Sequence, residues 1–240
     1  AMRPRLQIIF QDPYSSLDPR MRVGEIITEP LKAATSMSRS QRRDRAVQLL
    51  EKVGLRASDL ERYPHEFSGG QSHRIGIARA LAGQPELVVA DEPVSALDVS
   101  IQAQVINLLV DLQEEYGLSY VFISHDLSVV EHLCNRVGVM YLGRIVELAR
   151  VEEFRKDPRH PYTRSLRASV PVPNPERPWQ PAPLEGDVPN PMAPPRGCSF
   201  HPRCRYAFEP CAVERPELVQ VADAHWVACW LNHGKGILGT

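Results

Sequence analysis

Residues 67–98 decide the fold class, and they read F-S-G-G-Q-S-H-R-I-G-I-A-R-A-L-A-G-Q-P-E-L-V-V-A-D-E-P-V-S-A-L-D. Ser68 is a strong N-cap residue, and Gly69 and Gly70 allow a ligand to approach the backbone closely. Apolar residues then recur at helical spacing until Gly83, where we expect the helix to end. Free amide groups at the start of such a helix favour the binding of a phosphate.

A short apolar run follows at residues 87–90 and is typical of a buried parallel strand. Two carboxylates, Asp91 and Glu92, come directly after it. Open α/β folds place ligands and chemistry at the carboxyl ends of such strands. Taken alone, Gly-Gly after Ser is usually a loop-to-helix junction, and two acids after a strand usually form a solvated turn. The order and spacing of both features decide against these simpler interpretations.

This order and spacing resemble those of the ATP-binding subunits of ABC transporters. The resemblance implies an α/β fold, namely a P-loop NTPase-like ABC nucleotide-binding domain with a helical subdomain and, in this chain, a small Cys-rich C-terminal extension. It implies ATP and Mg²⁺ as cofactors. The corresponding motifs are the signature sequence at 67–71, the Walker B strand at 87–91, the catalytic Glu92 and the D-loop at 95–98.

The resemblance also assigns a role to each motif. Asp91 would hold Mg²⁺, and Glu92 would polarise the attacking water. The signature residues would bind the nucleotide of a second ATPase subunit in a head-to-tail dimer, and Asp98 of the D-loop is counted among the nucleotide-binding residues. The signature residues concerned are Ser68, Gly69, Gly70 and Gln71.

Two more polar residues come directly after apolar strands. Gln11 follows the run at 6–10, and His125 follows the run at 119–124. By itself, a lone glutamine after a strand is usually a surface residue, and a single histidine is more often structural than catalytic. The resemblance implies that Gln11 is the Q-loop residue, which contacts Mg²⁺ and the attacking water, and that His125 reaches the terminal phosphate. We therefore expect Gln11, Glu92 and His125 to be catalytic.

Composition divides the chain into three parts. Residues 1–168 are expected to form the ATPase domain, with a helical subdomain at roughly 23–83 and a β-hairpin at 137–148 that turns at Gly143 and Arg144. Ten of the 22 prolines fall between residues 170 and 196, which predicts an extended linker at 169–196. Residues 197–240 are expected to form a Cys-rich region like that of oligopeptide importers.

Four of the five cysteines, Cys198, Cys204, Cys211 and Cys229, lie in the last 43 residues, separated by five, six and seventeen residues. Four thiolates can bind zinc or an iron–sulfur cluster. Zinc sites usually pair ligands roughly two to four residues apart, and no gap here is that short. The resemblance implies a 4Fe–4S cluster; zinc, or reduced or paired cysteines, are the alternatives. Metal ligation would help to fold so short a tail.

The composition argues against nucleic acid as a partner, because a formal net charge of −1 gives no basic field. No apolar run of about eighteen residues occurs, and the start of the chain does not resemble a secretory signal. We expect a peripheral protein at the cytoplasmic face of the cell membrane. A reducing compartment also favours metal binding over disulfides in the Cys-rich region.

One expected motif is missing from the 240 residues. G-x-x-x-x-G-K-[ST], the Walker A loop that cradles the phosphates, occurs nowhere in the sequence. In the ABC family it precedes the Q-loop by a few tens of residues, whereas Gln11 lies near the start here. We expect an ATPase domain that is incomplete at its N-terminus, so this chain alone should bind ATP poorly.

The segments at 10–21 (F-Q-D-P-Y-S-S-L-D-P-R-M) and 157–163 (D-P-R-H-P-Y-T) resemble the peptide-importer branch, most of all its dipeptide-importer ATPase subunits. The expected function is ATP hydrolysis that energises dipeptide or oligopeptide import. The implied partners are a second ATPase subunit, two transmembrane permease subunits and, indirectly, a solute-binding protein. The alternatives are a nickel or other solute importer, a truncated, non-catalytic interaction protein, and a soluble ABC ATPase of DNA repair or translation.

Overall fold

The computed structural model describes residues 5–95, 97–170 and 184–233, and it divides into two compact units, Ala1–Val129 and Val130–Thr240. The predicted linker at 169–196 falls largely on residues 171–183, which lie outside the described residues. Among the described residues, no helix is both long and apolar enough to cross a membrane.

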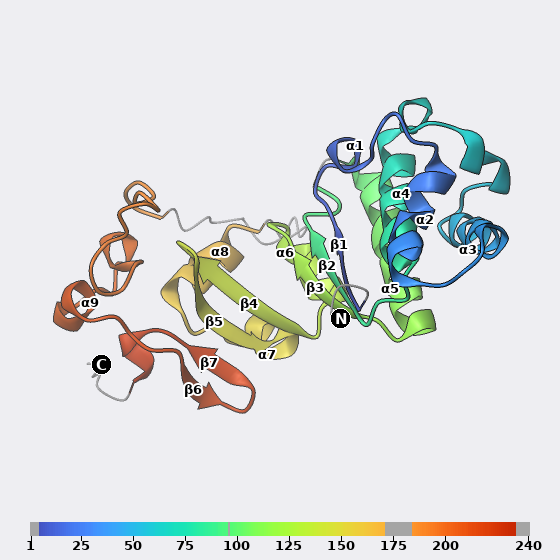
Figure 1. The fold of residues 1–240 in the computed structure, drawn as a ribbon. Coiled ribbons are helices and arrows are strands. Elements are labelled where there is room, and N and C mark those ends of the chain that lie inside the picture. The colour runs from blue at the N-terminus through green and yellow to red at the C-terminus, as the bar shows by residue number, and fades with distance from the viewer. Residues whose placement is uncertain (1–4, 96, 171–183, 234–240) are drawn as a thin grey trace, which may run out of the picture. The chain divides into compact units, whose positions relative to one another are not determined.

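The first unit contains a parallel sheet in the order β1-β2-β3, and the helices α2 to α5 lie to one side of it (Figure 1). Its strands are β1 (Leu6–Ile9), β2 (Leu87–Asp91) and β3 (Ser119–Ile123). Ile9 pairs with Ala90, and Asp91 pairs with Ile123, so the carboxyl ends of the three strands meet at one end of the sheet. The residues that follow the strands are therefore brought close together.

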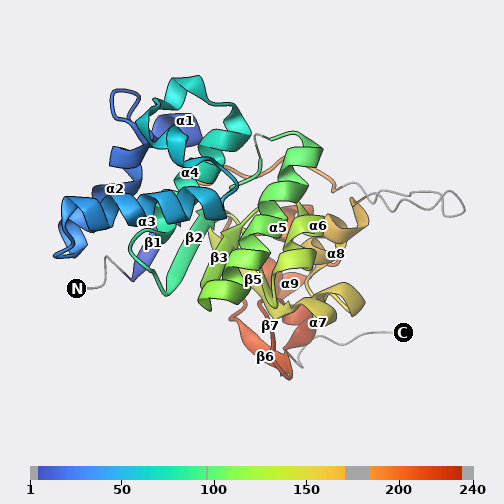
Figure 2. The ribbon, with the colours of Figure 1, turned by 90° about the vertical axis from the view of Figure 1, so that its right-hand side faces the viewer.

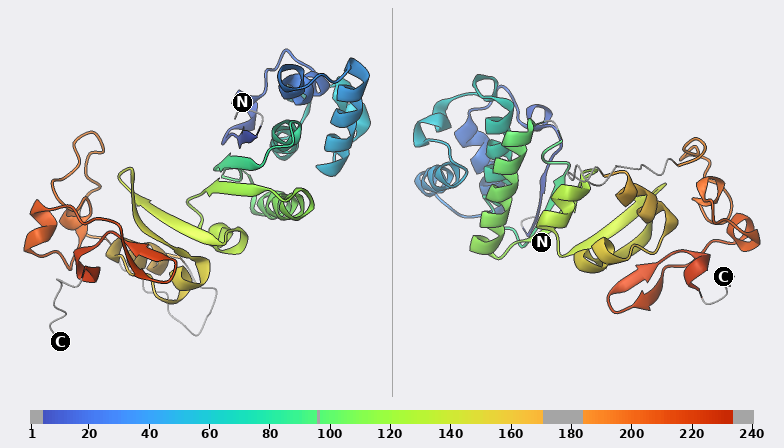
Figure 3. Two further views of the ribbon diagram at one scale, coloured as in Figure 1. Left: turned by 60° about the horizontal axis from the view of Figure 1, so that its bottom comes forward. Right: turned by 180° about the vertical axis from the view of Figure 1, so that it is seen from behind.

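Helices α4 and α5 lie on one side of this sheet (Figures 1 and 3). α4 (Gly69–Leu81) begins after its N-cap Ser68, as predicted, and α5 (Val99–Tyr116) ends at Gly117. Ile77 of α4 and Leu109 of α5 are buried in one core with Val88 of β2. The other helices of this unit are α1 (Pro13–Ser16), α2 (Val23–Ala34), α3 (Arg39–Lys52), η1 (Ala57–Glu61) and η2 (Pro64–Glu66).

An antiparallel sheet in the order β4-β5-β7-β6 organises the second unit. β4 (Arg136–Tyr141) and β5 (Arg144–Arg150) form the predicted hairpin. The predicted turn was wrong by one residue: Leu142 and Gly143 make the turn, because Arg144 already pairs with Tyr141 in the ladder. Both turn residues have positive φ angles, as the tightest hairpin turns require.

The two remaining strands of this sheet were not predicted. β6 (Val219–Ala222) and β7 (His225–Val227) lie side by side (Figure 2), and β7 pairs with β5. Val227 is fully buried and pairs with Glu147, so strand pairing joins the Cys-rich region to the hairpin. Three strand residues are too few to show an alternating pattern in the sequence.

Short helices complete the second unit. The yellow helices α7 (Val151–Lys156) and α8 (Pro161–Ala168) lie on one side of β4 and β5 (Figure 3, right). Phe200 is buried at the centre of an aromatic cluster, with its ring centre 5.2 Å from that of Tyr141 and 5.5 Å from that of Tyr162. The other elements are α6 (Leu127–Leu133), which contains the boundary between the units, η3 (His201–Arg203), α9 (Glu209–Val213) and η4 (Trp230–Asn232).

Candidate functional site

Glu92 lies between two polar side chains at the carboxyl end of the parallel sheet. The Gln11 amide donates a hydrogen bond from Nε2 to Glu92 Oε2 at 2.8 Å, and His125 Nδ1 lies 3.4 Å from Glu92 Oε1. The side chain of Glu92 is 27% exposed and that of His125 is 73% exposed, so a ligand can reach both from solvent. The structure thus brings together the three residues that the sequence predicted to be catalytic.

The backbone of Glu92 adopts a conformation that is unusual for a residue with a side chain. Its φ angle is +43°, a region that costs a non-glycine residue about 1–3 kcal/mol. The surrounding backbone holds it there: its amide donates to Ile123 O at 3.0 Å, and its carbonyl accepts from both Ser95 N and Ser95 Oγ. Such strain persists mainly where function requires a particular side-chain direction.

The two aspartates predicted to bind nucleotide or Mg²⁺ lie on either side of Glu92 in the sequence. Asp91 is the last residue of β2 and is half-buried. Asp98 is the N-cap residue of α5, and its carbonyl accepts from Gln102 N at 2.8 Å. Among the described residues, neither carboxylate accepts a hydrogen bond. Both therefore have oxygen atoms free for a ligand.

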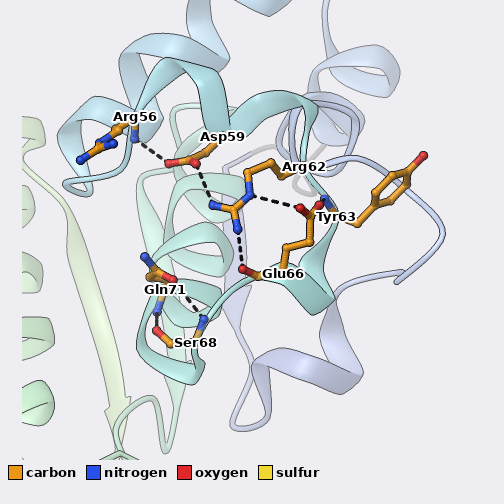
Figure 4. A network of polar contacts seen from close by, with 7 residues as sticks. All are labelled: Arg56, Asp59, Arg62, Tyr63, Glu66, Ser68 and Gln71. Atoms are coloured by element: carbon orange, nitrogen blue, oxygen red, sulfur yellow. Dashed lines mark hydrogen bonds and ion pairs between the residues drawn. The ribbon is translucent and has the colours of Figure 1, made fainter.

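The signature sequence forms the first turn of α4 and is closed by a reciprocal capping box (Figure 4). Ser68 N donates to Gln71 Oε1 at 3.0 Å, and Gln71 N donates to Ser68 Oγ at 3.4 Å. Gly70 has no room for a side chain, because a Cβ atom there would lie 2.8 Å from Ile101 Cγ2. No hydrogen bond joins this turn to Gln11, Glu92 or His125 among the described residues.

The chain that leads into α4 is held by Arg62 (Figure 4). Its guanidinium donates to Asp59 Oδ1 at 3.2 Å and to the Glu66 carbonyl at 2.6 Å. It also lies over the ring of Phe67, with 4.4 Å between Cζ and the ring centre. The residue before Ser68 is therefore anchored by both charge and packing, which fixes where α4 begins.

Behind the signature turn, α4 carries two buried polar side chains that sequence reasoning did not place. Ser72 is fully buried and His73 is 2% exposed, and neither Ser72 Oγ nor His73 Nε2 has a hydrogen-bond partner. Burial lowers the pKa of His73, and the charge of Asp12 opposes that shift. Arg74 donates to the carbonyl of Val53 at 2.8 Å. These three residues therefore pack within the unit.

The four clustered cysteines form a second candidate site, in the second unit. Gly197 has a φ angle of +67°, and a Cβ atom on it would clash with the carbonyl oxygen of Cys211. This close approach lets Cys198 N donate to Cys211 O at 2.8 Å. Burial, with a smaller effect from the other three thiols, raises the pKa of Cys229 to about 12. The four thiols are thus within electrostatic range of one another.

All five cysteines are unpaired thiols. Among the described residues, however, no group of three or more His, Cys, Asp or Glu side chains is already arranged to hold a metal ion. The thiols are gathered but do not form a completed coordination shell. The fifth cysteine, Cys134, is half-buried just after α6.

The sequence matches two known families. Residues 1–95 match the family described as ABC transporter, and residues 146–211 match the family described as Oligopeptide/dipeptide transporter, C-terminal region. The first match contains the signature turn and Glu92. The second begins within β5 and contains α7, α8 and three of the four clustered cysteines.

Several curated proteins are similar over almost the whole chain. A probable peptide ABC transporter ATP-binding protein of Sinorhizobium fredii is 56% identical over 95% of this chain and 65% of its own length. The Dipeptide transport ATP-binding proteins of Haemophilus influenzae and Escherichia coli are 52% and 53% identical over 95% of this chain, and over 70% and 68% of their own lengths. The chain therefore spans about two thirds of the length of these relatives.

Two solved structures share the fold. A subunit from Clostridium perfringens that is part of the ABC transporter complex cbiONQ has a TM-score of 0.57 and 27% identity, over 65% of this chain and 61% of that chain. A dimeric, post-hydrolysis ATP-binding cassette bound to ADP and Pi has a TM-score of 0.54 and 31% identity, over 61% of this chain and 63% of that chain.

Proposed function

The chain belongs to the ATP-binding proteins of peptide ABC transporters, and we propose that it acts within an ATP-hydrolysing subunit that drives peptide import. The α/β fold class predicted from the sequence is confirmed by its relatives and by the solved structures. The observation that carries the proposal is the meeting of Gln11, Glu92 and His125 at the carboxyl ends of parallel strands. Open α/β sheets bind ligands at this position.

In this proposal Glu92 is the general base for the attacking water. The Gln11 amide donates to Glu92 Oε2, which leaves Oε1, on the side of His125, to accept the proton of a water molecule. A positioned base of this kind contributes about 10²- to 10⁴-fold to a rate. His125 is exposed enough to donate to the terminal phosphate of ATP. Asp91 offers carboxylate oxygens, which Mg²⁺ prefers as ligands.

The signature turn and the D-loop serve a second nucleotide in this proposal. Ser68 and Gln71 are exposed at the start of α4, where backbone amides favour a phosphate. Because this turn makes no hydrogen bond to the Glu92 group among the described residues, we assign it, together with Asp98, to the ATP of a second ATPase subunit in a head-to-tail dimer. Two permease subunits and, indirectly, a solute-binding protein complete the proposed importer at the cytoplasmic face of the membrane.

The domain limits remain a prediction. We propose an ATPase domain at 1–168, a linker at 169–196 and a Cys-rich region at 197–240. The family match at 146–211 overlaps all three, and the two compact units meet at Val129 and Val130. The hairpin β4–β5 shares its sheet with β7, so it belongs to the same unit as the Cys-rich region.

Substitution of Glu92 tests the catalytic assignment in an assembled importer that hydrolyses ATP. Glu92→Gln keeps the shape and removes the base, so hydrolysis should fall by about 10²- to 10⁴-fold while nucleotide still binds and holds the dimer closed. Glu114→Gln, an exposed change on α5, is the matched control and should leave hydrolysis unchanged. Equal rates for the two variants would reject Glu92 as the base and favour a non-catalytic role.

We further propose that the Cys-rich region binds a 4Fe–4S cluster, with zinc as the alternative. Support comes from four unpaired thiols within electrostatic range of one another and from the contact that Gly197 permits between Cys198 and Cys211. Four thiolates can hold such a cluster. When bound, the cluster would supply a redox-active cross-link. Its role in this proposal is structural, because the hydrolytic residues lie in the other unit.

Metal analysis of anaerobically purified protein tests this assignment. A 4Fe–4S protein should be brown, absorb broadly at about 400 nm and contain about four irons per chain. Replacement of Cys211 by Ser should abolish the colour, whereas the same change at Cys134 should not. Colourless protein with one zinc per chain would reject the cluster but keep the four ligands. Metal-free, fully folded protein would reject both.

A further inference from the structure

A cavity of about 250 Å³ opens in the second unit between α8 and the chain around η3. Three arginines line it: Arg164 from α8, and Arg203 and Arg205 from the Cys-rich region. The rings of Phe200 and Tyr206 form part of its apolar wall. The cavity thus combines positive charge with aromatic surface in one concave site.

The three guanidiniums are held by backbone and ring contacts. Among the residues that the structure describes, none of them forms an ion pair with a carboxylate. Arg164 Nε donates to the carbonyl of Pro158 at 2.8 Å, and Arg203 Nε donates to that of Gly186 at 3.1 Å. These bonds fix the direction of two side chains and leave their terminal nitrogens for another acceptor.

Arg205 lies beside an aromatic ring. Its Cζ is 5.0 Å from the ring centre of Tyr206, which holds the guanidinium next to the apolar wall. Glu185 also lines the cavity, so the walls carry three cations and one carboxylate. Three like charges around one cavity repel one another, and an anion bound among them would offset that repulsion. The arrangement therefore favours a ligand that carries negative charge.

We infer that this cavity binds a small oxyanion ligand, a carboxylate or a phosphate, that also carries an apolar group. Guanidiniums bind both oxyanions through paired N–H···O hydrogen bonds. Tyr206, which is 42% exposed, supplies the aromatic surface for a flat apolar group, because Phe200 is only 2% exposed. An apolar cavity of about 150 Å³ admits benzene, so about 250 Å³ holds a ring together with its oxyanion.

The inference is independent of the proposed ATPase function. Every residue that lines the cavity lies in the second unit, whereas Gln11, Glu92 and His125 lie in the first. Failure of one proposal therefore leaves the other standing. A ligand bound in this cavity would act as an effector of the second unit. The residues that line the cavity fall within the match to the peptide-transporter C-terminal family.

Calorimetric titration of the 240-residue protein tests the site. The probes are phenyl phosphate, 3-phenylpropionate, inorganic phosphate, and the neutral 3-phenylpropanamide as a control. We expect phenyl phosphate to bind more tightly than inorganic phosphate, because only the former contacts the rings. The neutral amide should not bind measurably, because it lacks the charge that the arginines require. Binding should also weaken as salt is added.

Charge-removing variants then locate the binding. Arg164→Gln and Arg205→Gln should each lower the affinity for phenyl phosphate about tenfold, since each removes a hydrogen bond to a charged group. Arg215→Gln, an exposed change in the same unit but outside the cavity, removes the same charge and should leave affinity unchanged. Circular dichroism confirms that the variants are folded, and Arg203 is left intact because it holds the backbone of Gly186.

The possible outcomes separate the ligand sources. Binding of phenyl phosphate alone identifies a phosphate ligand, and binding of 3-phenylpropionate alone identifies a carboxylate; either result supports the site. The inference is overturned if no anionic probe binds at millimolar concentration. It is also overturned if the Arg215 variant loses as much affinity as the two cavity variants.

Discussion

His225 and Glu147 form a buried hydrogen-bonded pair, with 2.7 Å between His225 Nε2 and Glu147 Oε1 and both side chains 1% exposed. They lie 78 residues apart in the chain. The Glu147 carboxylate also accepts from the amides of Arg159 and His160, each at 2.8 Å. Because a carboxylate can only accept, His225 Nε2 carries the proton. One side chain on β5 thus binds the segment before α8 and the C-terminal strand β7.

Loss of this carboxylate should destabilise the second unit. Glu147→Gln replaces one acceptor oxygen by an NH₂ group that cannot accept, so at least one buried donor loses its partner. Removing one partner of a buried, hydrogen-bonded ion pair typically lowers the free energy of unfolding by about 3–5 kcal/mol. We expect a loss of about 3 kcal/mol in urea unfolding followed by the fluorescence of Trp226 and Trp230. Glu152→Gln, an exposed change on α7, should stay within about 0.5 kcal/mol of the parent. Equal midpoints for the two variants would contradict the proposed role of Glu147.

Acid should lower the stability of the fold, because His160 is buried in its neutral form. This side chain is 1% exposed, and burial lowers its pKa from 6.5 to about 4. Between these values the unfolded chain binds more protons than the folded one, so stability falls as the pH falls from about 6.5 to about 4. The full pH change should lower the free energy of unfolding by about 3 kcal/mol. The neutral form is needed because His160 Nδ1 accepts from Tyr162 N at 3.1 Å.

The measurement is urea unfolding at several pH values for the parent and for His160→Asn. Asparagine cannot titrate in this range and still offers an acceptor at this N-cap position. We expect the variant to be less stable at neutral pH but to show a flatter dependence below pH 6.5. An identical dependence in both proteins would show that His160 does not carry the effect.

The 240-residue chain alone should bind ATP weakly. Its sequence contains no G-x-x-x-x-G-K-[ST], whose backbone amides and lysine provide most of the phosphate contacts in this fold. Asp91 and His125 offer only isolated contacts at the end of the sheet. Calorimetric titration with magnesium and ATP should therefore show no micromolar binding. A dissociation constant in the micromolar range would refute this expectation.

A bulky side chain at the signature turn should prevent ATP hydrolysis by the assembled importer. Ser68→Arg places a long cation where the nucleotide of a second subunit is proposed to lie, so ATP hydrolysis by the full-length assembly should be lost. Ser38 provides a matched control, because it caps α3 with Gln41 in the same reciprocal arrangement. Ser38→Arg should cost about 1 kcal/mol of stability and leave hydrolysis intact. Normal hydrolysis by the Ser68 variant would remove the signature turn from the site.

Much of the first unit could be predicted because its signals are local. Ser68 and Gln71 sit three residues apart and close the start of α4, and the run at 87–90 makes β2. The polar residues after β1, β2 and β3 were predicted to be catalytic from the family resemblance, and they meet because parallel strands align their carboxyl ends. The left-handed backbone of Glu92 was not predicted, since a non-glycine residue adopts it only when neighbours such as Ile123 and Ser95 hold it there.

By itself, the sequence determined the start of α4, the parallel strands, the hairpin and the family, because caps, periodicity and motifs act over a few residues. Only the tertiary structure decided that β7 pairs with β5, that Glu147 meets His225 and that Arg164 joins Arg203 and Arg205 around one cavity. These contacts join residues far apart in the chain. They depend on strand register and on the packing of Phe200, and no local pattern encodes either.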